Sequence, residues 1–438
     1  MEIKLADETT PPPPPPGAGP DRISDGDDVS RNAPTAPPAS SRADLRHRLN
    51  SATTSCDVPL AAIDMDAWDA NAEELLHRAA GTPIRVVSAA LRNRALLRDA
   101  LGREGFRGVL AYTLSEAIWL AGTGICDDAV VAYPSADRRA LSRLVSDEHL
   151  AGRVTIMVDD IAQLDLVDAV AAPEARAELR VCLDLDCSWQ ALRGRIRSGA
   201  RRSPLRAPED VVRLARAVVS RPGFRLVGLQ AFETQFANAH DHLPRRGLRA
   251  RLHRMIQKRS ERDLAARRAA VIDAVCNVTD LEFVTGGGTG SIRDTAAAHG
   301  ITEVAAGSGL LGPVTLDNNS AGYRPAAFFA LPVVRRPGPG TVTVAGGGYL
   351  ASGPADPLRL PVPWLPEGLR LSRSEGAGQT QTPLLGATAD GLALGDLVWF
   401  RHGKAGELAE HFYSYHLVRG ERLVDTAPTY RGDGKTFL

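Results

Sequence analysis

The chain is poor in lysine. Of its 52 basic side chains only four are lysines, at Lys4, Lys258, Lys404 and Lys435, so the other 48 are arginines (52 − 4 = 48). Together with abundant alanine, this bias indicates a high-GC genome before it indicates a function. Arginine stays protonated in proteins, so side-chain amines can come from these four positions alone.

Three further absences exclude classes of protein. Five cysteines without paired spacing predict neither a zinc site nor a disulfide framework, as in a cytoplasmic protein with reduced thiols. Acidic and basic side chains balance at a net charge of zero, which argues against nucleic acid or an anionic membrane as partner. No apolar run approaches the ~18 residues of a membrane span, and no apolar segment marks a secretory signal.

Residues 1–50 are rich in proline, alanine, serine and aspartate, with an unbroken proline run from Pro11 to Pro16. Such a composition buries too little apolar surface to offset the entropy of ordering. We therefore expect a disordered tail. A polyproline segment that docks on a partner is the alternative to a passive tail.

Residues 55–318 alternate between short apolar runs and longer amphipathic ones. The short runs are rich in leucine or β-branched residues, as strands buried on both faces should be. Eight such strands alternating with helices predict an α/β fold with a closed (β/α)8, TIM-type barrel. The expected strands are Ile84–Ser88, Gly108–Tyr112, Ala129–Tyr133, Val154–Val158, Leu179–Leu185, Leu226–Phe232, Leu281–Val284 and Glu303–Ala306.

Residues 320–438 have a different texture, in which proline and glycine separate short alternating segments. This pattern predicts a smaller β-rich C-terminal domain. Its expected strands include 326–334, 340–345, 392–400 and 416–424.

Two glycine-rich loops follow the last two barrel strands. The first is Gly286-Gly287-Gly288-Thr289-Gly290-Ser291, and the second contains Gly307-Ser308-Gly309. Consecutive glycines let backbone amides approach an anion, and barrels usually bind phosphate at this position. We therefore expect a phosphate-bearing ligand here, with simple tight turns as the alternative.

Other polar residues also lie at strand ends. Arg201 and Arg202 stand in an arginine-rich loop that could bind a substrate carboxylate or remain a solvated loop. Glu233 and Gln235 share one side of an extended segment and are expected to face the barrel mouth. Tyr112 could contact a ligand or occupy the rim.

As an ordered set, several short motifs resemble the amino acid deaminase/aldolase group, which is similar to D-threonine aldolases and has an alanine racemase N-terminal-type barrel. The likeness covers about residues 55–438. The motifs are Asp64-Met65-Asp66-Ala67, Arg85-Val86-Val87-Ser88, Ala111-Tyr112-Thr113, Ala132-Tyr133-Pro134, Arg202-Ser203-Pro204, the first glycine-rich loop and Pro428-Thr429-Tyr430-Arg431-Gly432.

The resemblance implies a fold-type III pyridoxal-phosphate (PLP) barrel that acts on small amino acids, and a contribution of residues 58–63 to the C-terminal domain. In that family a lysine at the end of the first barrel strand forms a Schiff base with PLP, but Ala89 occupies the matching position here. A methyl group cannot form an imine. A tyrosine that contacts the phosphate in the family aligns with Leu311. PLP is therefore expected to bind non-covalently or to have been lost.

D-threonine aldolases also hold a divalent metal through a histidine and a second ligand two residues later. The corresponding pair is His402 and Lys404, and an ammonium group cannot ligate a metal. We therefore do not expect a metal at His402. Lys404 is the one lysine that could replace the missing amine.

Two functional hypotheses follow. The chain is either a PLP-dependent lyase or racemase relative that uses Lys404 or a non-covalent cofactor, or a non-catalytic phosphate- or PLP-binding subunit. The expected partners are a small amino acid or related molecule and a second chain, either in a homodimer or in a heterodimer with an active paralogue.

Overall fold

The computed structural model describes residues 41–191, 196–233, 263–317, 322–353 and 356–438. Residues 1–40 lie outside these ranges, so the disorder of the tail remains a prediction for them. Gln235 lies outside them as well, so its place at the barrel mouth also remains a prediction. Within the described residues no helix is long and apolar enough to cross a membrane.

The beginning of the described chain corrects one prediction. Helix α1 (Arg42–Ala52) forms where disorder was expected. A capping box between Ser41 and Asp44 starts the helix, and its Leu49 is fully buried in a cluster that contains Trp399. The prediction failed because it rested on the proline-rich composition of the preceding residues. The two leucines of the helix gave no contrary signal, since their packing partners are distant in sequence.

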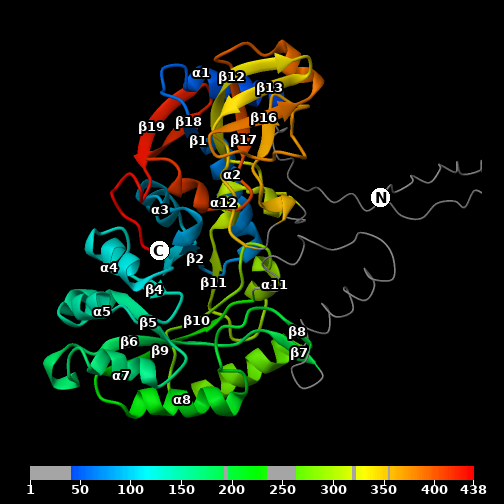
Figure 1. The fold of residues 1–438 in the computed structure, drawn as a ribbon. Coiled ribbons are helices and arrows are strands. Elements are labelled where there is room, and N and C mark those ends of the chain that lie inside the picture. Colours follow the sequence, from blue (N-terminus) through cyan, green and yellow to red (C-terminus); the bar gives the residue numbers. More distant parts are fainter. Residues whose placement is uncertain (1–40, 192–195, 234–262, 318–321, 354–355) are drawn as a thin grey trace, which may run out of the picture. The chain divides into compact units, whose positions relative to one another are not determined.

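Eight parallel strands form a closed barrel, in the spatial order β10-β11-β2-β3-β4-β5-β6-β9 (Figure 1). Every predicted barrel strand is present, which confirms the TIM-type fold. The bounds are β2 Ile84–Val87, β3 Phe106–Ala111, β4 Ala129–Val131, β5 Val154–Val158, β6 Leu179–Asp184, β9 Phe224–Ala231, β10 Phe283–Gly286 and β11 Glu303–Ala306.

Helices connect these strands, and side chains at the strand ends start several of them. Asp64, Asn93 and Thr113 each accept a hydrogen bond from a backbone amide in the first turn of α2, α3 and α4, which satisfies donors that a helix start leaves free. The helices are α2 Met65–Ala79, α3 Arg94–Leu101, α4 Leu114–Gly122, α5 Arg138–Val145, α6 Glu148–Arg153, α7 Ala162–Asp168, α8 Pro208–Ser220, α11 Ile292–Ala296 and α12 Ser308–Leu311, with a further helical segment at 263–276.

Short 3-10 turns and one small hairpin complete this part of the chain. The hairpin pairs β7 (Trp189–Ala191) with β8 (Ile196–Ser198) in the arginine-rich loop. The 3-10 turns are η1 Ser88–Ala90, η2 Pro173–Ala175, η3 Val314–Leu316, η4 Pro357–Arg359, η5 Ala387–Gly391 and η6 Glu407–Glu410.

A separate nine-stranded sheet holds the C-terminal residues, as the β-rich pattern predicted. Strand β1 (Leu60–Asp64) lies inside this sheet, antiparallel to β12 and parallel to β18. The predicted segment 416–424 is two strands, because Gly420 turns the chain between β18 and β19. The bounds are β12 Ala327–Gly338, β13 Thr341–Ala345, β14 Val362–Leu365, β15 Arg370–Leu371, β16 Gln381–Leu385, β17 Leu397–Arg401, β18 Ser414–Arg419 and β19 Arg422–Pro428.

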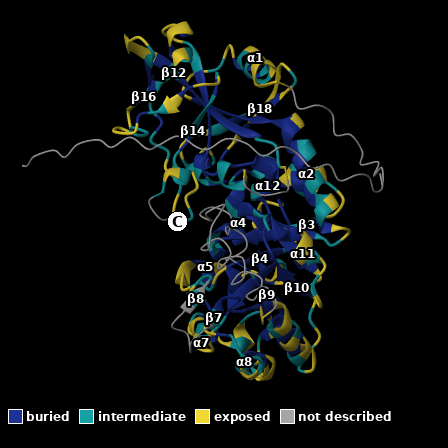
Figure 2. Cartoon of the chain, turned by 90° about the vertical axis from the view of Figure 1, so that its right-hand side faces the viewer, coloured by how far each residue is buried: buried dark blue, intermediate teal, exposed yellow. Residues whose placement is uncertain are grey.

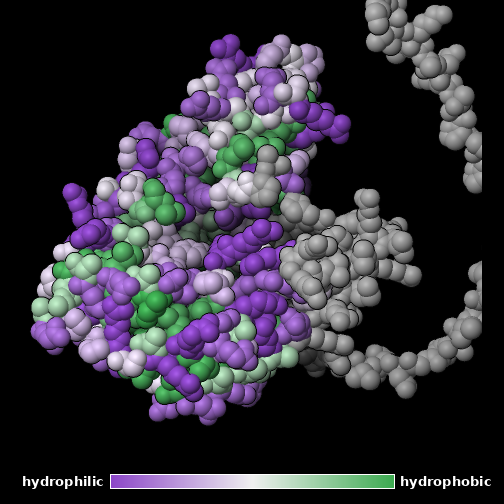
Figure 3. All heavy atoms as spheres, turned by 60° about the horizontal axis from the view of Figure 1, so that its bottom comes forward, coloured by the Kyte–Doolittle hydropathy of each residue, from purple (hydrophilic) through white to green (hydrophobic). Residues whose placement is uncertain are grey.

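The burial of the residues follows the arrangement of the strands and helices. The barrel strands and the centre of the nine-stranded sheet are buried, while the outer faces of helices such as α1, α7 and α8 are exposed (Figure 2). On the face shown in Figure 3, hydrophilic residues predominate and hydrophobic residues form separate patches. On this face the hydrophobic patches stay separate, and the candidate site is built from the strand ends instead.

Candidate functional site

A cavity of about 290 Å³ opens at the carboxyl ends of the barrel strands. Residues from five strand ends line it, and a loop of the C-terminal domain closes one side. The lining residues are Val87, Ala89, Ala90, Arg92, Tyr133, Arg202, Phe232, Gly288, Thr289, Ala305, Ala306, Gly307, Ser308, Thr315, Leu316, Lys404, Ala405 and Glu407. The cavity thus brings together Ala89, both glycine-rich loops, Arg202 and Lys404, which the sequence singled out separately.

The two glycine-rich loops are joined through the Thr289 hydroxyl. The Ser308 hydroxyl donates a hydrogen bond to Thr289 Oγ1 at 3.0 Å, and the Gly309 amide donates to the same oxygen at 3.2 Å. Gly287 has a φ of +78°, and a Cβ there would lie 2.9 Å from Thr295 Oγ1. A side chain at this position would therefore be both strained and crowded.

Donors remain for an anion at this point. Among the described residues, the backbone amides of Thr289 and Gly290 have no hydrogen-bond acceptor, and Thr289 lines the cavity. Gly288 and Gly307 line it too, and a Cβ at Gly307 would lie 2.8 Å from the Val87 carbonyl oxygen. Backbone amides in such a turn favour a phosphate or another small oxyanion.

Ala89 lies in η1, directly after β2, and lines the same cavity; β2 pairs with β11, so this turn lies next to the second glycine-rich loop. The C-terminal domain packs tightly here, because a Cβ at Gly406 would lie only 1.9 Å from the Ala89 carbonyl oxygen. Gly406 has a φ of +98°, so glycine is required both for the backbone conformation and for the close approach. This contact fixes the loop that carries Lys404 beside Ala89.

Lys404 provides an amine in the cavity wall. Its Nζ donates a hydrogen bond to Ser352 Oγ at 2.9 Å and lies 3.9 Å from Glu407 Oε1. The side chain is 44% exposed, so this pair contributes little to stability. The amine is therefore accessible but held by neighbours within its own domain.

Arg92 is a cavity residue that the sequence did not reveal. Its φ of +47° is unusual for a residue with a side chain. Its guanidinium pairs with Glu410 at 2.6 Å, and its carbonyl accepts a hydrogen bond from the Tyr430 amide at 2.8 Å. Two segments of the C-terminal domain thus hold this strained residue at the cavity wall.

The predicted substrate residues occupy different places. Arg202 lines the cavity with its guanidinium 5.2 Å from the centre of the Tyr133 ring, whereas Arg201 is exposed outside the cavity lining. Glu233 is buried and pairs with Arg268, and it also accepts a hydrogen bond from Thr295 Oγ1 at 3.1 Å. Its carboxylate therefore supports the first glycine-rich loop from behind.

Tyr112 is not one of the described residues that line the cavity. It is buried, and its ring packs edge-on to Phe437 with 6.4 Å between the centroids. The guanidinium of Arg92 lies 5.1 Å from the Tyr112 ring. This environment corresponds to the rim alternative for Tyr112. Leu311, which aligns with the family's phosphate tyrosine, is buried in the hydrophobic core.

A buried carboxyl group lies beneath the Ala89 turn. Glu116 accepts hydrogen bonds from the Tyr112 amide and from the Tyr430 hydroxyl, each at 2.8 Å. Burial raises the pKa of Glu116 to about 7, although these bonds, the Ser88 hydroxyl and the charge of Arg92 oppose the shift. The Glu116 carboxyl group thus links the barrel to the C-terminal segment that contains Tyr430.

His402 lies deep in the protein. Burial lowers the pKa of this histidine to about 3, so the ring is neutral at physiological pH. In the described part of the chain, no cluster of three or more His, Cys, Asp or Glu side chains is arranged to hold a metal.

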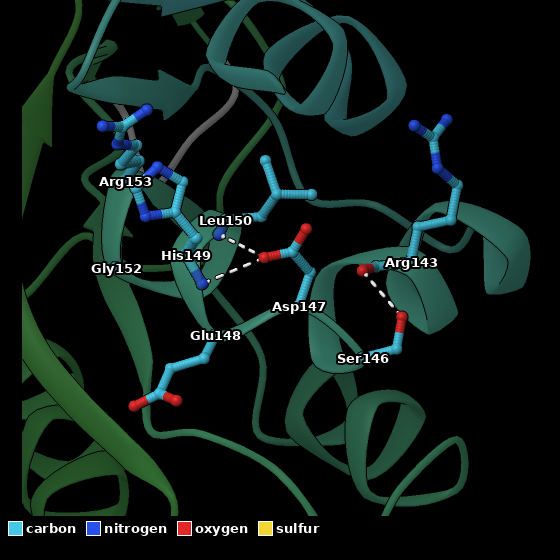
Figure 4. Close-up of a pocket in the computed structure, with 8 residues that line it drawn as sticks. All are labelled: Arg143, Ser146, Asp147, Glu148, His149, Leu150, Gly152 and Arg153. Atoms are coloured by element: carbon cyan, nitrogen blue, oxygen red, sulfur yellow. Dashed lines mark hydrogen bonds between the residues drawn. The ribbon is translucent and has the colours of Figure 1, made fainter.

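A larger hollow of about 900 Å³ lies at α5 and α6, away from the strand ends (Figure 4). The Asp147 carboxylate in it accepts hydrogen bonds from the amides of His149 and Leu150, at 3.0 and 3.1 Å. These bonds cap α6. We therefore interpret the hollow as an exterior groove between two helix ends.

Known proteins resemble the chain in sequence and in fold. No family model matches it. A 3-hydroxy-D-aspartate aldolase of Paracoccus denitrificans is 27% identical over 245 residues, which make up 53% of this chain and 54% of the relative. The chain thus spans about half the length of the curated relatives it matches.

Solved structures cover more of the chain. D-threonine aldolase from Filomicrobium marinum superimposes with a TM-score of 0.71 at 22% identity, covering 86% of this chain and 95% of that one. D-threo-3-hydroxyaspartate dehydratase from Delftia sp. HT23 gives a TM-score of 0.67 at 19% identity, covering 86% and 98%. These relatives match the group that the sequence motifs indicated: the chain has the alanine racemase-like fold, with a parallel eight-stranded barrel and an attached β-rich domain.

Proposed function

We propose that the barrel mouth binds PLP, or a ligand with a similar phosphate, without a covalent link to the barrel, in a protein that binds or acts on small amino acids. One observation carries the proposal. The same cavity contains a turn suited to a phosphate and, where the family has its lysine, the methyl group of Ala89.

The phosphate half of the cavity fits the cofactor. The Thr289 and Gly290 amides would donate to the phosphate, with the Ser308 hydroxyl beside them. When bound, PLP supplies an electron sink for chemistry at the α-carbon of an amino acid. Arg202, on the far wall, is the candidate partner for the amino acid carboxylate.

The turn after β2 does not fit covalent attachment of PLP. Ala89 has no nucleophile, and Lys404 is the one amine among the described lining residues. Binding without turnover therefore agrees best with the geometry. The proposal includes a dimer, either with a second copy or with an active paralogue that supplies the chemistry.

A second function has one observation in its favour. Lys404 lines the same cavity as Ala89, so it could serve as a replacement amine in an active lyase or racemase. The relatives named above are an aldolase and a dehydratase of hydroxy amino acids, and their reactions are the reference for this alternative.

Absorbance titration of the purified chain with PLP tests the binding. We expect saturable binding that inorganic phosphate weakens by competition, and that Gly287→Leu abolishes. Binding that is unaltered by both phosphate and this substitution would show that the cofactor lies elsewhere. A protein that binds no PLP would refute the proposal.

A further inference from the structure

A second, smaller cavity lies on the floor of the barrel mouth. Its volume is about 20 Å³, which suits a single water-sized group. The ends of β4, β6 and β9 surround it, and it shares Tyr133, Arg202 and Phe232 with the main cavity. A ligand in the main cavity could therefore place one small group here.

Asp184 and Gln230 provide buried acceptors in the floor cavity, which Arg202 also lines. Gln230 donates from Nε2 to the Ala132 carbonyl at 3.2 Å and to Asp184 Oδ1 at 3.4 Å. These bonds fix the orientation of the amide and leave Gln230 Oε1 buried without a hydrogen-bond donor. Gln230 is 4% exposed and Asp184 is 7% exposed, and bulk water does not reach Gln230 Oε1. An unsatisfied buried acceptor destabilises the folded chain, and a donor in the cavity would remove that cost.

The charge of Asp184 also favours a hydrogen-bond donor in the floor cavity. Burial raises the pKa of Asp184 to about 7, and the Asp159 and Asp186 carboxylates add to the shift, whereas the Gln230 hydrogen bond and the Arg202 charge oppose it. A cation in the floor cavity would favour the ionised carboxylate. Among groups of about the size of one water, an ammonium supplies both the charge and several donors.

We propose that the floor cavity binds the ammonium group of a small amino acid, through Asp184 and Gln230, while Arg202 binds its carboxylate. This inference rests on the amino acid ligand of the proposed function, but not on PLP. It places recognition of the amine on the β6 and β9 side of the barrel mouth, on residues that the sequence did not single out. A resident water is the competing occupant.

Calorimetric titration with three small ligands tests the site. D- and L-alanine carry an ammonium and a carboxylate, lactate replaces the ammonium with a hydroxyl, and propionate has neither. We expect the order alanine, lactate, propionate in falling affinity. Equal affinities, or no binding of alanine by the wild-type chain, would overturn the inference and leave a water as the occupant.

Two substitutions localise the effect. Asp184→Asn keeps the shape but removes the charge, and Gln230→Met removes the acceptor. Each should weaken alanine binding by about tenfold or more and change propionate binding by less than about twofold. The surface substitution Asp210→Asn, on α8, is the matched control and should change neither. Equal loss for alanine and propionate would contradict the assignment.

Parallel titrations with PLP separate this inference from the proposed function. If PLP binds but alanine binding does not depend on Asp184 and Gln230, the floor site fails and the cofactor proposal stands. If PLP does not bind while the alanine pattern holds, the cofactor proposal fails and the floor site stands. Thermal unfolding of each variant checks that it folds, and Gln230→Met tests the site if Asp184→Asn does not.

Discussion

Two parts of the main cavity differ in their chemistry: the loops after β10 and β11, and the turn after β2. The loops contribute glycines and the hydroxyls of Thr289 and Ser308 to the cavity lining, and we propose that they bind a phosphate. The turn contributes Ala89, which the sequence resemblance aligns with the Schiff-base lysine of the family. Under this proposal phosphate binding depends on the loops and covalent attachment on the turn, so the two properties can be tested separately.

The largest effect is expected from restoring the amine. Ala89→Lys should convert a chain with no barrel-linked cofactor into one that retains PLP after borohydride reduction, because a side-chain amine then faces the cavity. Mass spectrometry of the peptide that contains residue 89 measures the result. Ala89→Met, which has similar bulk without an amine, is the control and should retain none.

Disturbing the first glycine-rich loop should abolish PLP binding without replacing any residue of the Ala89 turn. Gly287→Leu places a side chain at a φ of +78° against Thr295. We expect a loss of PLP affinity of about 100-fold or more, from backbone strain together with crowding. Absorbance titration measures it. Gly81→Leu, at a positive φ with open space around it, controls for backbone strain alone and should bind PLP normally.

The buried Glu116 links the Ala89 turn to the end of the chain, and it should make stability depend on pH. Its folded pKa of about 7 lies above its ordinary value of 4.5. Between these pH values the unfolded chain releases a proton that the folded chain keeps. This group's contribution is therefore fully present below about pH 4.5 and is lost as the pH rises to about 7.

Glu116→Gln should remove that dependence. The variant should gain stability relative to the wild type by up to about 3 kcal/mol between pH 5 and pH 8. Denaturant unfolding of both proteins across this range measures the difference. A constant difference at every pH would show that Glu116 does not titrate in the folded protein.

A smaller effect is expected from the hydroxyl that joins the two glycine-rich loops. Thr289→Val keeps the shape but removes the acceptor for Ser308 and Gly309. Loss of two hydrogen bonds at about 1 kcal/mol each should weaken PLP binding by about 30-fold. Thr302→Val, outside the cavity lining, is the control. Unchanged affinity in Thr289→Val would mean that the loops hold their positions without this bond.

The fold was predictable because buried parallel strands leave a local signal. Each barrel strand is a short apolar run, and both glycine-rich loops follow such runs directly. Neither the floor cavity nor the place of Arg92 in the main cavity has such a local signal in the sequence. Arg92 and Glu410 are 318 residues apart, and Glu116 and Tyr430 are 314 apart. Strand alternation predicted that Glu233 faces the barrel mouth, whereas its carboxylate pairs with Arg268 from another segment, a partner that the sequence does not indicate.

Borohydride reduction of the wild-type chain with PLP, followed by intact and peptide mass spectrometry, tests the central claim most directly. The account predicts saturable PLP binding before reduction. After reduction it predicts that no residue of the cavity, Lys404 included, carries PLP. Lys404→Met should accordingly change PLP affinity by less than about twofold. PLP attached to Lys404 in the wild-type chain would contradict the account and make this lysine the catalytic amine.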